Sequence, residues 1–176
     1  MWWLAAENAF VLASVRRAFV AASITWTALL VVVPFLASRP HASTPGTALV
    51  VAVYGIGSFV CHQLAERSYR LWSAQMPVCA RCTGIYFGAA VAAAIVGARG
   101  APPGLATRRT GRPAIRQGGV TRRHARTLLA AAVAPTVATL VYEWTTGDVP
   151  SNGLRCAAGV PIGVAVVWLI VSVSGE

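Results

Sequence analysis

The chain has 176 residues, of which 56% are hydrophobic and 11% are charged, and its formal net charge is +10. Soluble globular domains carry about 25% charged residues, so this composition excludes that class and predicts a chain mostly immersed in lipid. The length predicts a single domain, residues 1–176. All 15 basic residues are arginines that cluster between apolar segments, which favours topology signals and lipid-headgroup contacts over nucleic-acid binding.

Five apolar segments predict an all-α fold, a polytopic transmembrane helix bundle of about five spans. In chain order they are residues 18–37, 46–61, 83–98, 127–145 and 156–173. A full span needs about 20 apolar residues, so the second and third segments must borrow flanking residues to cross a bilayer. Residues 1–17 are predicted to be an N-terminal interfacial segment, in which Trp2 and Trp3 touch the bilayer. The long apolar run after Arg16 and Arg17 favours an uncleaved helix over a signal-type start.

Residues 99–126 contain arginines interleaved with Gly, Pro and Thr, without a helical or strand period, and this pattern predicts a loop. The positive-inside rule places this Arg-rich loop in the cytoplasm. Because successive spans alternate between sides, the hairpin 62–82 and the turn 146–155 share the opposite, extracytoplasmic face of the cell membrane. Arg16 and Arg17 conflict with this assignment, since five spans put them on the extracytoplasmic side.

Three of the four cysteines and one histidine lie at the edges of the hairpin. Cys61 and His62 end the second apolar segment, and a Cys-Ala-Arg-Cys motif, residues 79–82, opens the third. The two-residue spacing lets both sulfurs of that motif face one centre, and a helix N-terminus favours thiolate. Together Cys61, His62, Cys79 and Cys82 predict a metal site with zinc as the expected ion. Adjacent helical residues diverge by about 100°, so Cys61 and His62 share one ion only if the helix has already ended.

The same cysteines support two other interpretations. On an oxidising face Cys79 and Cys82 can cycle between dithiol and disulfide, with Cys61 or Cys156 as the exchange partner. A static disulfide, or thiols that are merely buried, would leave a non-enzymatic protein that handles metal or stabilises an assembly. The sequence alone leaves these alternatives open.

Polar residues at the ends of the later segments are predicted to share the face of the cysteines. Glu143 closes the fourth segment, Asn152 and Arg155 open the fifth, and Gln63 follows the Cys-His pair. We expect these four residues to orient a lipid or phosphate-bearing substrate beside the metal. Three of them also have a plainer role: Glu143 as a capping or snorkelling carboxylate, and Asn152 and Arg155 as turn and helix-start residues.

Four glycines at four-residue spacing predict close helix–helix contacts, namely Gly84, Gly88, Gly159 and Gly163. A nucleophile elbow, a Walker loop and an HExxH motif are all absent from the sequence, which excludes the commonest hydrolase and nucleotide-binding classes. The expected partners are membrane lipids and not nucleic acid. The oligomeric state stays open.

Two sequence blocks resemble one prokaryotic integral-membrane family. The first block comprises Cys61-His62-Gln63, Glu66-Arg67-Ser68 and Met76-Pro77-Val78-Cys79-Ala80-Arg81-Cys82-Thr83-Gly84-Ile85-Tyr86-Phe87-Gly88. The second comprises Ser151-Asn152, Arg155, Gly159 and Gly163. Over roughly residues 50–170 these blocks are similar to domain-of-unknown-function family 2085. The resemblance implies a small polytopic membrane protein of bacterial or archaeal origin, and it supplies no chemistry.

Overall fold

The computed structural model describes residues 2–40, 43–99 and 122–173 of the chain. These residues form five α-helices, one short 3-10 helix and one two-stranded hairpin, so the predicted all-α class is confirmed. The elements are α1 (Trp2–Ala37), α2 (Thr44–Val60), η1 (Ala65–Arg67), β1 (Arg70–Leu71), β2 (Ala74–Gln75), α3 (Ala80–Arg99), α4 (Arg122–Thr146) and α5 (Asn152–Val173).

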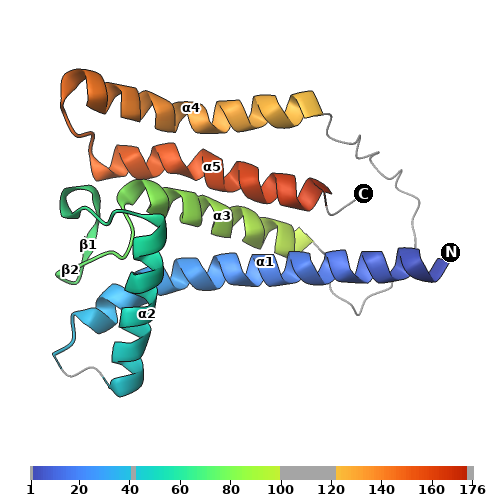
Figure 1. The fold of residues 1–176 in the computed structure, drawn as a ribbon, viewed down its shortest axis with the longest axis horizontal. Coiled ribbons are helices and arrows are strands. Elements are labelled where there is room, and N and C mark those ends of the chain that lie inside the picture. The colour runs from blue at the N-terminus through green and yellow to red at the C-terminus, as the bar shows by residue number, and fades with distance from the viewer. Residues whose placement is uncertain (1, 41–42, 100–121, 174–176) are drawn as a thin grey trace.

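Four helices lie side by side in the order α1, α3, α5, α4, and α2 lies steeply across one end of them (Figure 1). Each of the four contains a segment long and apolar enough to cross a membrane, namely Arg17–Ala37, Ala80–Gly97, His124–Thr146 and Asn152–Val171. The second predicted segment forms α2, which has only 17 residues. The described bundle therefore has four candidate spans and one shorter apolar helix at its end.

Helix α2 carries apolar side chains on its outer side. Val51, Ile56 and Phe59 are all exposed, and Phe59 is 91% exposed. An apolar surface of this kind suits contact with lipid, because lipid removes the apolar side chains from water. On its inner side Gly57 lies against the carbonyl of Pro77, where any Cβ would overlap the backbone. A glycine at this position lets α2 approach the hairpin closely.

Because α2 lies across the bundle, the two ends of the molecule have distinct contents. The C-terminal end of α1, the hairpin and the α4–α5 turn lie together at one end (Figure 1). The C-terminus of α3 and the start of α4 lie at the other end (Figure 1), and near the C-terminus of α3 Gly97 is close to Val20 in the middle of α1. Arg17 precedes Val20 by less than one turn of α1, and Arg126 is near the start of α4, so both lie toward this end and four spans avoid the conflict that five alternating spans created. Most of the predicted Arg-rich loop, residues 100–121, is outside the described residues.

The closest helix pair in the bundle is α3 with α5, and its contact surface is made of glycine. A Cβ on Gly84 or Gly88 would overlap the backbone carbonyl of Cys156 or Val160 on α5. The reciprocal overlap holds for the two predicted glycines of α5, Gly159 and Gly163. Lipid offers no hydrophobic drive for helix association, so close backbone packing of this kind stabilises the pair. The predicted glycine contacts are confirmed.

The hairpin between α2 and α3 packs against α1. Strands β1 and β2 pair antiparallel, with Leu71 opposite Ala74, and Trp72 and Ser73 form the turn with φ of 51° and 69°. Two successive positive φ values match the twist of a two-residue hairpin turn. The Trp72 ring makes an edge contact with Phe35 of α1 at 5.4 Å between centroids. Beneath the hairpin, a buried cluster joins Leu30 of α1 to two residues that precede α3, Met76 and Val78.

Candidate metal centre and arginine cluster

The position of Cys61 follows from where α2 ends. The helix stops at Val60, and Cys61 is extended, with φ of −149° and ψ of 139°, while its N–H still donates to the Gly57 carbonyl at 2.9 Å. The helix has thus ended before Cys61, which is the condition under which Cys61 and His62 could share one ion. In extended backbone, however, adjacent side chains point to opposite sides. His62 is accordingly exposed and does not join the group that Cys61 forms with the other thiols.

Three thiols converge where α2 ends and α3 begins. The sulfur atoms of Cys61, Cys79 and Cys82 all lie within 4.8 Å of one another. Cys79 precedes the first residue of α3, and its N–H donates to the Cys61 sulfur at 3.2 Å. All four cysteines, including Cys156 on α5, are free thiols. Cys156 lies outside the group of three, beside the hydroxyl of Tyr69.

The surroundings of Cys79 favour its charged form. The pKa of Cys79 is lowered to about 5, mainly because the Cys82 thiol hydrogen-bonds to its sulfur, while burial acts in the opposite direction. Backbone N–H groups at the start of α3 contribute to the same shift. At neutral pH Cys79 is therefore a thiolate, the form that ligates metals and attacks disulfides.

The thiols open onto a polar pocket of about 380 Å³. Its lining consists of Val60, Cys61, His62, Gln63, Leu64, Arg67, Cys79, Arg81 and Cys82. Three of the four predicted metal ligands thus form one group in this pocket, and the fourth, His62, lines the same pocket at its exposed side. Arg67 and Arg81 supply positive charge to the wall.

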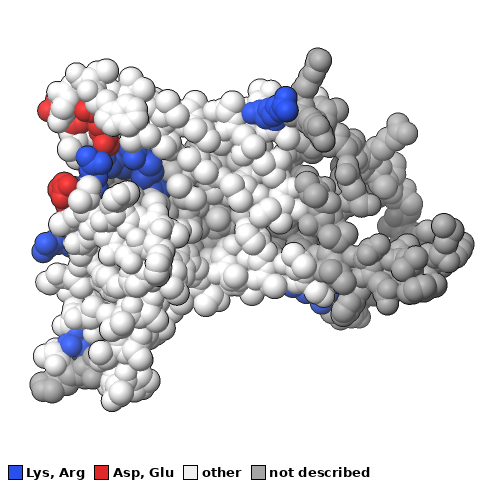
Figure 2. Space-filling model, in the orientation of Figure 1, with Lys and Arg blue, Asp and Glu red and all other residues white. Residues whose placement is uncertain are grey.

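Behind the pocket, one buried carboxylate holds three arginines from three parts of the chain. Glu143 of α4 is 8% exposed, and its Oε1 accepts hydrogen bonds from Arg81 Nη2 at 3.1 Å and Arg155 Nε at 3.0 Å. Arg67 Nη1 lies 3.7 Å from the other carboxylate oxygen. Figure 2 shows basic and acidic side chains close together at the hairpin end, whereas the middle of the described face is uncharged. We call Arg67, Arg81, Arg155 and Glu143 the arginine cluster.

Two other predicted site residues, Gln63 and Asn152, form hydrogen bonds with backbone carbonyl groups. The Gln63 side-chain nitrogen donates to the carbonyls of Tyr54 and Pro77, at 2.9 and 2.7 Å, so it ties α2 to the segment before α3. The Asn152 carbonyl accepts from the Tyr69 hydroxyl at 2.8 Å, and the Asn152 side chain donates to the Ser68 carbonyl at 3.3 Å. These bonds attach the hairpin to the start of α5. In the structure both residues position the pocket wall.

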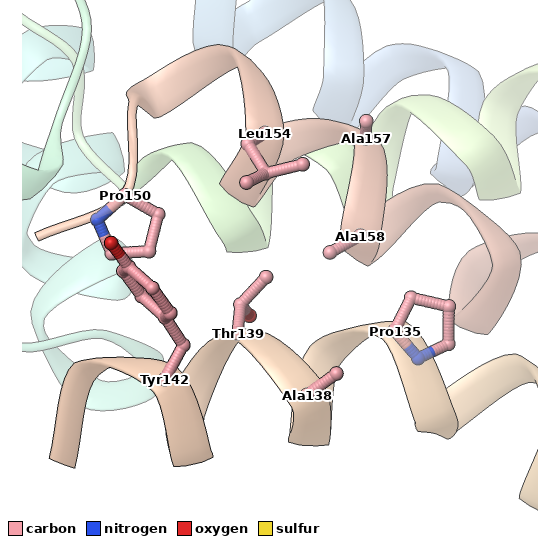
Figure 3. A pocket seen from close by; sticks show the side chains of 8 residues that line it. All are labelled: Pro135, Ala138, Thr139, Tyr142, Pro150, Leu154, Ala157 and Ala158. Carbon is pink, nitrogen blue, oxygen red and sulfur yellow. The ribbon is translucent and has the colours of Figure 1, made fainter. Parts of the chain in front are cut away.

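An apolar groove lies between α4 and α5, next to the arginine cluster (Figure 3). Its volume is about 520 Å³, and its lining consists of Pro135, Ala138, Thr139, Tyr142, Pro150, Leu154, Ala157 and Ala158. The Thr139 hydroxyl accepts a hydrogen bond from Arg81 Nη2 at 3.1 Å. The Arg81 guanidinium therefore contacts the groove lining on one side and lines the polar pocket on the other.

The sequence indicated the shared face but missed how Arg67 and Arg81 are used. Both residues could be seen in local motifs, Arg67 beside Glu66 and Arg81 between two cysteines. Their common partner Glu143 lies 62 residues beyond Arg81, so no local pattern joins them. The available signal was topological, because all of these residues end or begin segments on one face.

Comparison with known proteins places this arrangement in a family. Residues 61–169 match a family described as "Predicted membrane protein (DUF2085)". The chain belongs to this family. The chain is also similar to a protein of Methanocaldococcus jannaschii described as "Uncharacterized protein MJ1492", with 36% identity over 58 residues, 33% of this chain and 37% of that protein. No solved structure matches the chain.

The region that matches DUF2085 begins at Cys61 and includes the three grouped thiols, the arginine cluster and the residues that attach the hairpin to α5. It leaves out α1 and α2. The DUF2085 match and the site therefore coincide in the sequence. The protein is an integral membrane protein with four candidate spans and a group of three thiols at one end of its bundle.

Proposed function

We propose that this protein is a membrane metalloprotein in which Cys61, Cys79 and Cys82 hold a zinc-class ion. The observation that carries the proposal is the convergence of the three sulfurs within 4.8 Å. In tetrahedral zinc thiolate sites the Zn–S distance of about 2.3 Å puts neighbouring sulfurs about 3.8 Å apart. The donor set also fits, because soft thiolates select zinc and other soft metals, and Cys79 is already ionised at neutral pH.

A three-thiol site leaves a fourth ligand position for water, substrate or another residue. Sites with three protein ligands are typical of catalytic zinc, whereas structural zinc is usually closed by four. Cys61, Cys79 and Cys82 would hold the ion, which would supply the Lewis-acid chemistry that a membrane-embedded enzyme on lipid or phosphate-bearing substrates requires. His62 lines the same pocket and is the candidate for closing the site in a non-enzymatic, metal-handling protein. The zinc content of His62→Ala separates these two forms of the proposal: retained zinc supports a site with an open fourth position, and lost zinc supports a site closed by His62.

The arginine cluster and its neighbours supply the rest of the site. Glu143 fixes the guanidinium groups of Arg81 and Arg155, and Arg81 also lines the thiol pocket. Gln63 and Asn152 hold the backbone that carries Cys61 and the hairpin. In this scheme Glu143, Arg155, Asn152 and Gln63 act as positioning residues for a substrate beside the ion.

We assign the thiol end of the bundle to the extracytoplasmic face of the cell membrane. With α2 lying across one end, the opposite end holds the C-terminus of α3 and the start of α4, which flank the Arg-rich stretch (Figure 1). Arg126 is near the start of α4, and Arg17 is less than one turn of α1 from Val20, which is close to Gly97 of α3. Positive charge of this kind marks the cytoplasmic side. The four candidate spans thereby satisfy the charge rule better than five alternating spans.

A second candidate function is thiol–disulfide exchange. Cys79 and Cys82 are adjacent free thiols in an open pocket, with Cys61 within reach as a third sulfur. In this reaction the two thiols become a disulfide while a substrate disulfide is reduced to two thiols. Thiol trapping in cells distinguishes the two functions, because exchange requires a reversible Cys79–Cys82 disulfide and a metal site requires none.

Elemental analysis of the detergent-purified protein tests the metal proposal. We expect about one zinc per chain in the unmodified protein and in Cys156→Ser, whose thiol lies outside the group. Cys61→Ser, Cys79→Ser and Cys82→Ser should each lose most of that metal. Absence of stoichiometric metal from the unmodified protein, purified without chelator, would overturn the proposal. Equal loss in Cys156→Ser would also contradict it, because the loss would not be specific to the three thiols.

A further inference from the structure

The charges of the arginine cluster do not balance within the protein. Three guanidinium groups share one carboxylate, so the cluster carries a net charge of +2, from three positive charges and one negative charge. Three of the four side chains are largely buried, with exposures of 2% for Arg155, 17% for Arg81 and 5% for Glu143, whereas the Arg67 side chain is 40% exposed. Buried positive charge without a counterion is costly, so a cluster of this kind favours a bound anion.

Hydrogen-bonding capacity in the cluster is also unused. Arg67 Nε, Arg81 Nε and Arg155 Nη1 are buried and have no hydrogen-bond partner in the described structure. Buried donors are nearly always paired, and an unpaired donor costs about 1–3 kcal/mol. Among the described residues the Arg67 guanidinium group makes only a long ion pair with Glu143, at 3.7 Å, so most of it is available to a ligand.

Two of these arginines line the polar pocket, and none of the described residues in its lining is acidic. We propose that this pocket binds a phosphate-type oxyanion, either free phosphate or the phosphate of a lipid headgroup, through Arg67 and Arg81. Planar guanidinium groups match the oxygens of phosphate in pairs, as lysine does not. Arg155 stays behind Glu143 and holds that carboxylate against Arg81. The inference deepens the proposed function by naming its substrate class, but the anion site itself needs no metal.

The charge of the neighbouring thiols is compatible with this anion. Three thiolates and a divalent ion would carry a net charge of −1, and the arginine cluster carries +2, so the thiol site and the arginine cluster together would carry a net charge of +1. An oxyanion bound by the arginines would lie in the same pocket as the ion. A phosphate ester held by Arg67 and Arg81 would then share the pocket with a Lewis acid, as metal-assisted phosphoryl chemistry requires.

Binding of inorganic phosphate to the purified protein, measured by calorimetry at constant ionic strength, tests the anion site. Arg67→Gln is the informative variant, because Arg67 is 40% exposed and its loss should leave the fold intact. Arg70→Gln is the matched control, since Arg70 is an exposed arginine of the same hairpin. We expect Arg67→Gln to weaken phosphate binding by about tenfold or more, as the loss of a charge-assisted contact predicts, and Arg70→Gln to bind normally.

A second arm identifies the source of the phosphate. Short-chain phosphatidate is compared with inorganic phosphate, and short-chain phosphatidylcholine serves as the lipid without net charge. Tighter binding of phosphatidate, weakened by Arg67→Gln and by Ala157→Phe in the α4–α5 groove, assigns the site to a lipid headgroup. Equal binding of phosphatidate and phosphate assigns it to a soluble phosphate.

Two results overturn the inference: no binding of either phosphate compound, or equal weakening by Arg67→Gln and Arg70→Gln. The zinc content of Arg67→Gln keeps this failure separate from that of the proposed function. If Arg67→Gln retains zinc and binds phosphate as tightly as the Arg70→Gln control, the anion site is refuted and the metal proposal is not.

Discussion

Replacing Glu143 by glutamine is the sharpest perturbation of the structure, because one carboxylate joins three helical neighbours. The substitution keeps the size of the side chain and removes its charge, which leaves three positive charges together. The Glu143 side chain is 5% exposed and its contacts with Arg81 and Arg155 are 3.1 and 2.9 Å, so these pairs are buried. Breaking a buried pair by removing one partner costs about 3–5 kcal/mol. Arg67, at 3.7 Å and 40% exposed, adds little.

That loss corresponds to a large change in melting temperature. For a chain of this size each kcal/mol lowers the melting temperature by about 2–4 °C, so Glu143→Gln should lower it by about 6–20 °C. The assay is thermal unfolding in detergent followed by tryptophan fluorescence, since Trp26 packs against the buried cluster beneath the hairpin. Glu66→Gln is the control, because Glu66 is an exposed carboxylate in the hairpin 62–82 at the same end of the bundle.

The reasoning would be refuted if Glu143→Gln and Glu66→Gln melted within about 2 °C of each other, because buried pairs should cost several kcal/mol. A second variant separates lost charge from general damage. Adding Arg155→Met to Glu143→Gln removes one of the uncompensated charges and fills the same space with an apolar side chain. We expect this double variant to recover part of the lost stability, since a buried pair can often be replaced by apolar residues at little cost.

Two further predictions concern the thiols and the helix contact. In metal-free protein, Cys79 should be alkylated by iodoacetamide at a rate nearly constant from about pH 6.5 to 8 and falling below pH 5, because its pKa is lowered to about 5 and the thiolate persists above that value. A rate that rises tenfold per pH unit up to pH 8, measured on the Cys79 peptide by mass spectrometry, would show an ordinary thiol. Gly84→Ala should lower the melting temperature, because its Cβ would overlap the Cys156 carbonyl, whereas Gly153→Ala has open space and should not. Equal melting of the two glycine variants would contradict the α3–α5 packing.

The sequence predicted the bundle and the face that carries the site, because both depend on patterns along the chain. Apolar runs predict helices, and alternation of spans joined the cysteine hairpin to Glu143 and Arg155, which the ion pairs at that end confirm. Glycine spacing predicted the α3–α5 contact for the same reason. Each of these features follows from local composition or from the order of the elements.

The direction of α2 and the place of His62 could not be predicted in this way. Hydropathy measures whether a segment is apolar, and α2 is apolar whether it crosses a bilayer or lies across the end of a bundle. The direction is set by tertiary contacts, such as the approach of Gly57 to Pro77. His62 was grouped with Cys61 because they are adjacent. The extended backbone at Cys61 instead separates the two side chains.

Arg81 connects the thiol group to the rest of the bundle. It lies between the two cysteines of the motif: Cys79 immediately precedes α3, and Arg81 and Cys82 are in the first turn of α3. Its carbonyl lies against Gly159 of α5, and its guanidinium bonds Thr139 and Glu143 of α4. Any shift of α5 along α3 would therefore move the turn that carries Cys79 and Cys82 and also disturb the arginine pairs. The glycine contact thus fixes the thiols and the positive wall of the pocket in one geometry, which is the preorganisation that a site for both an ion and an anion requires.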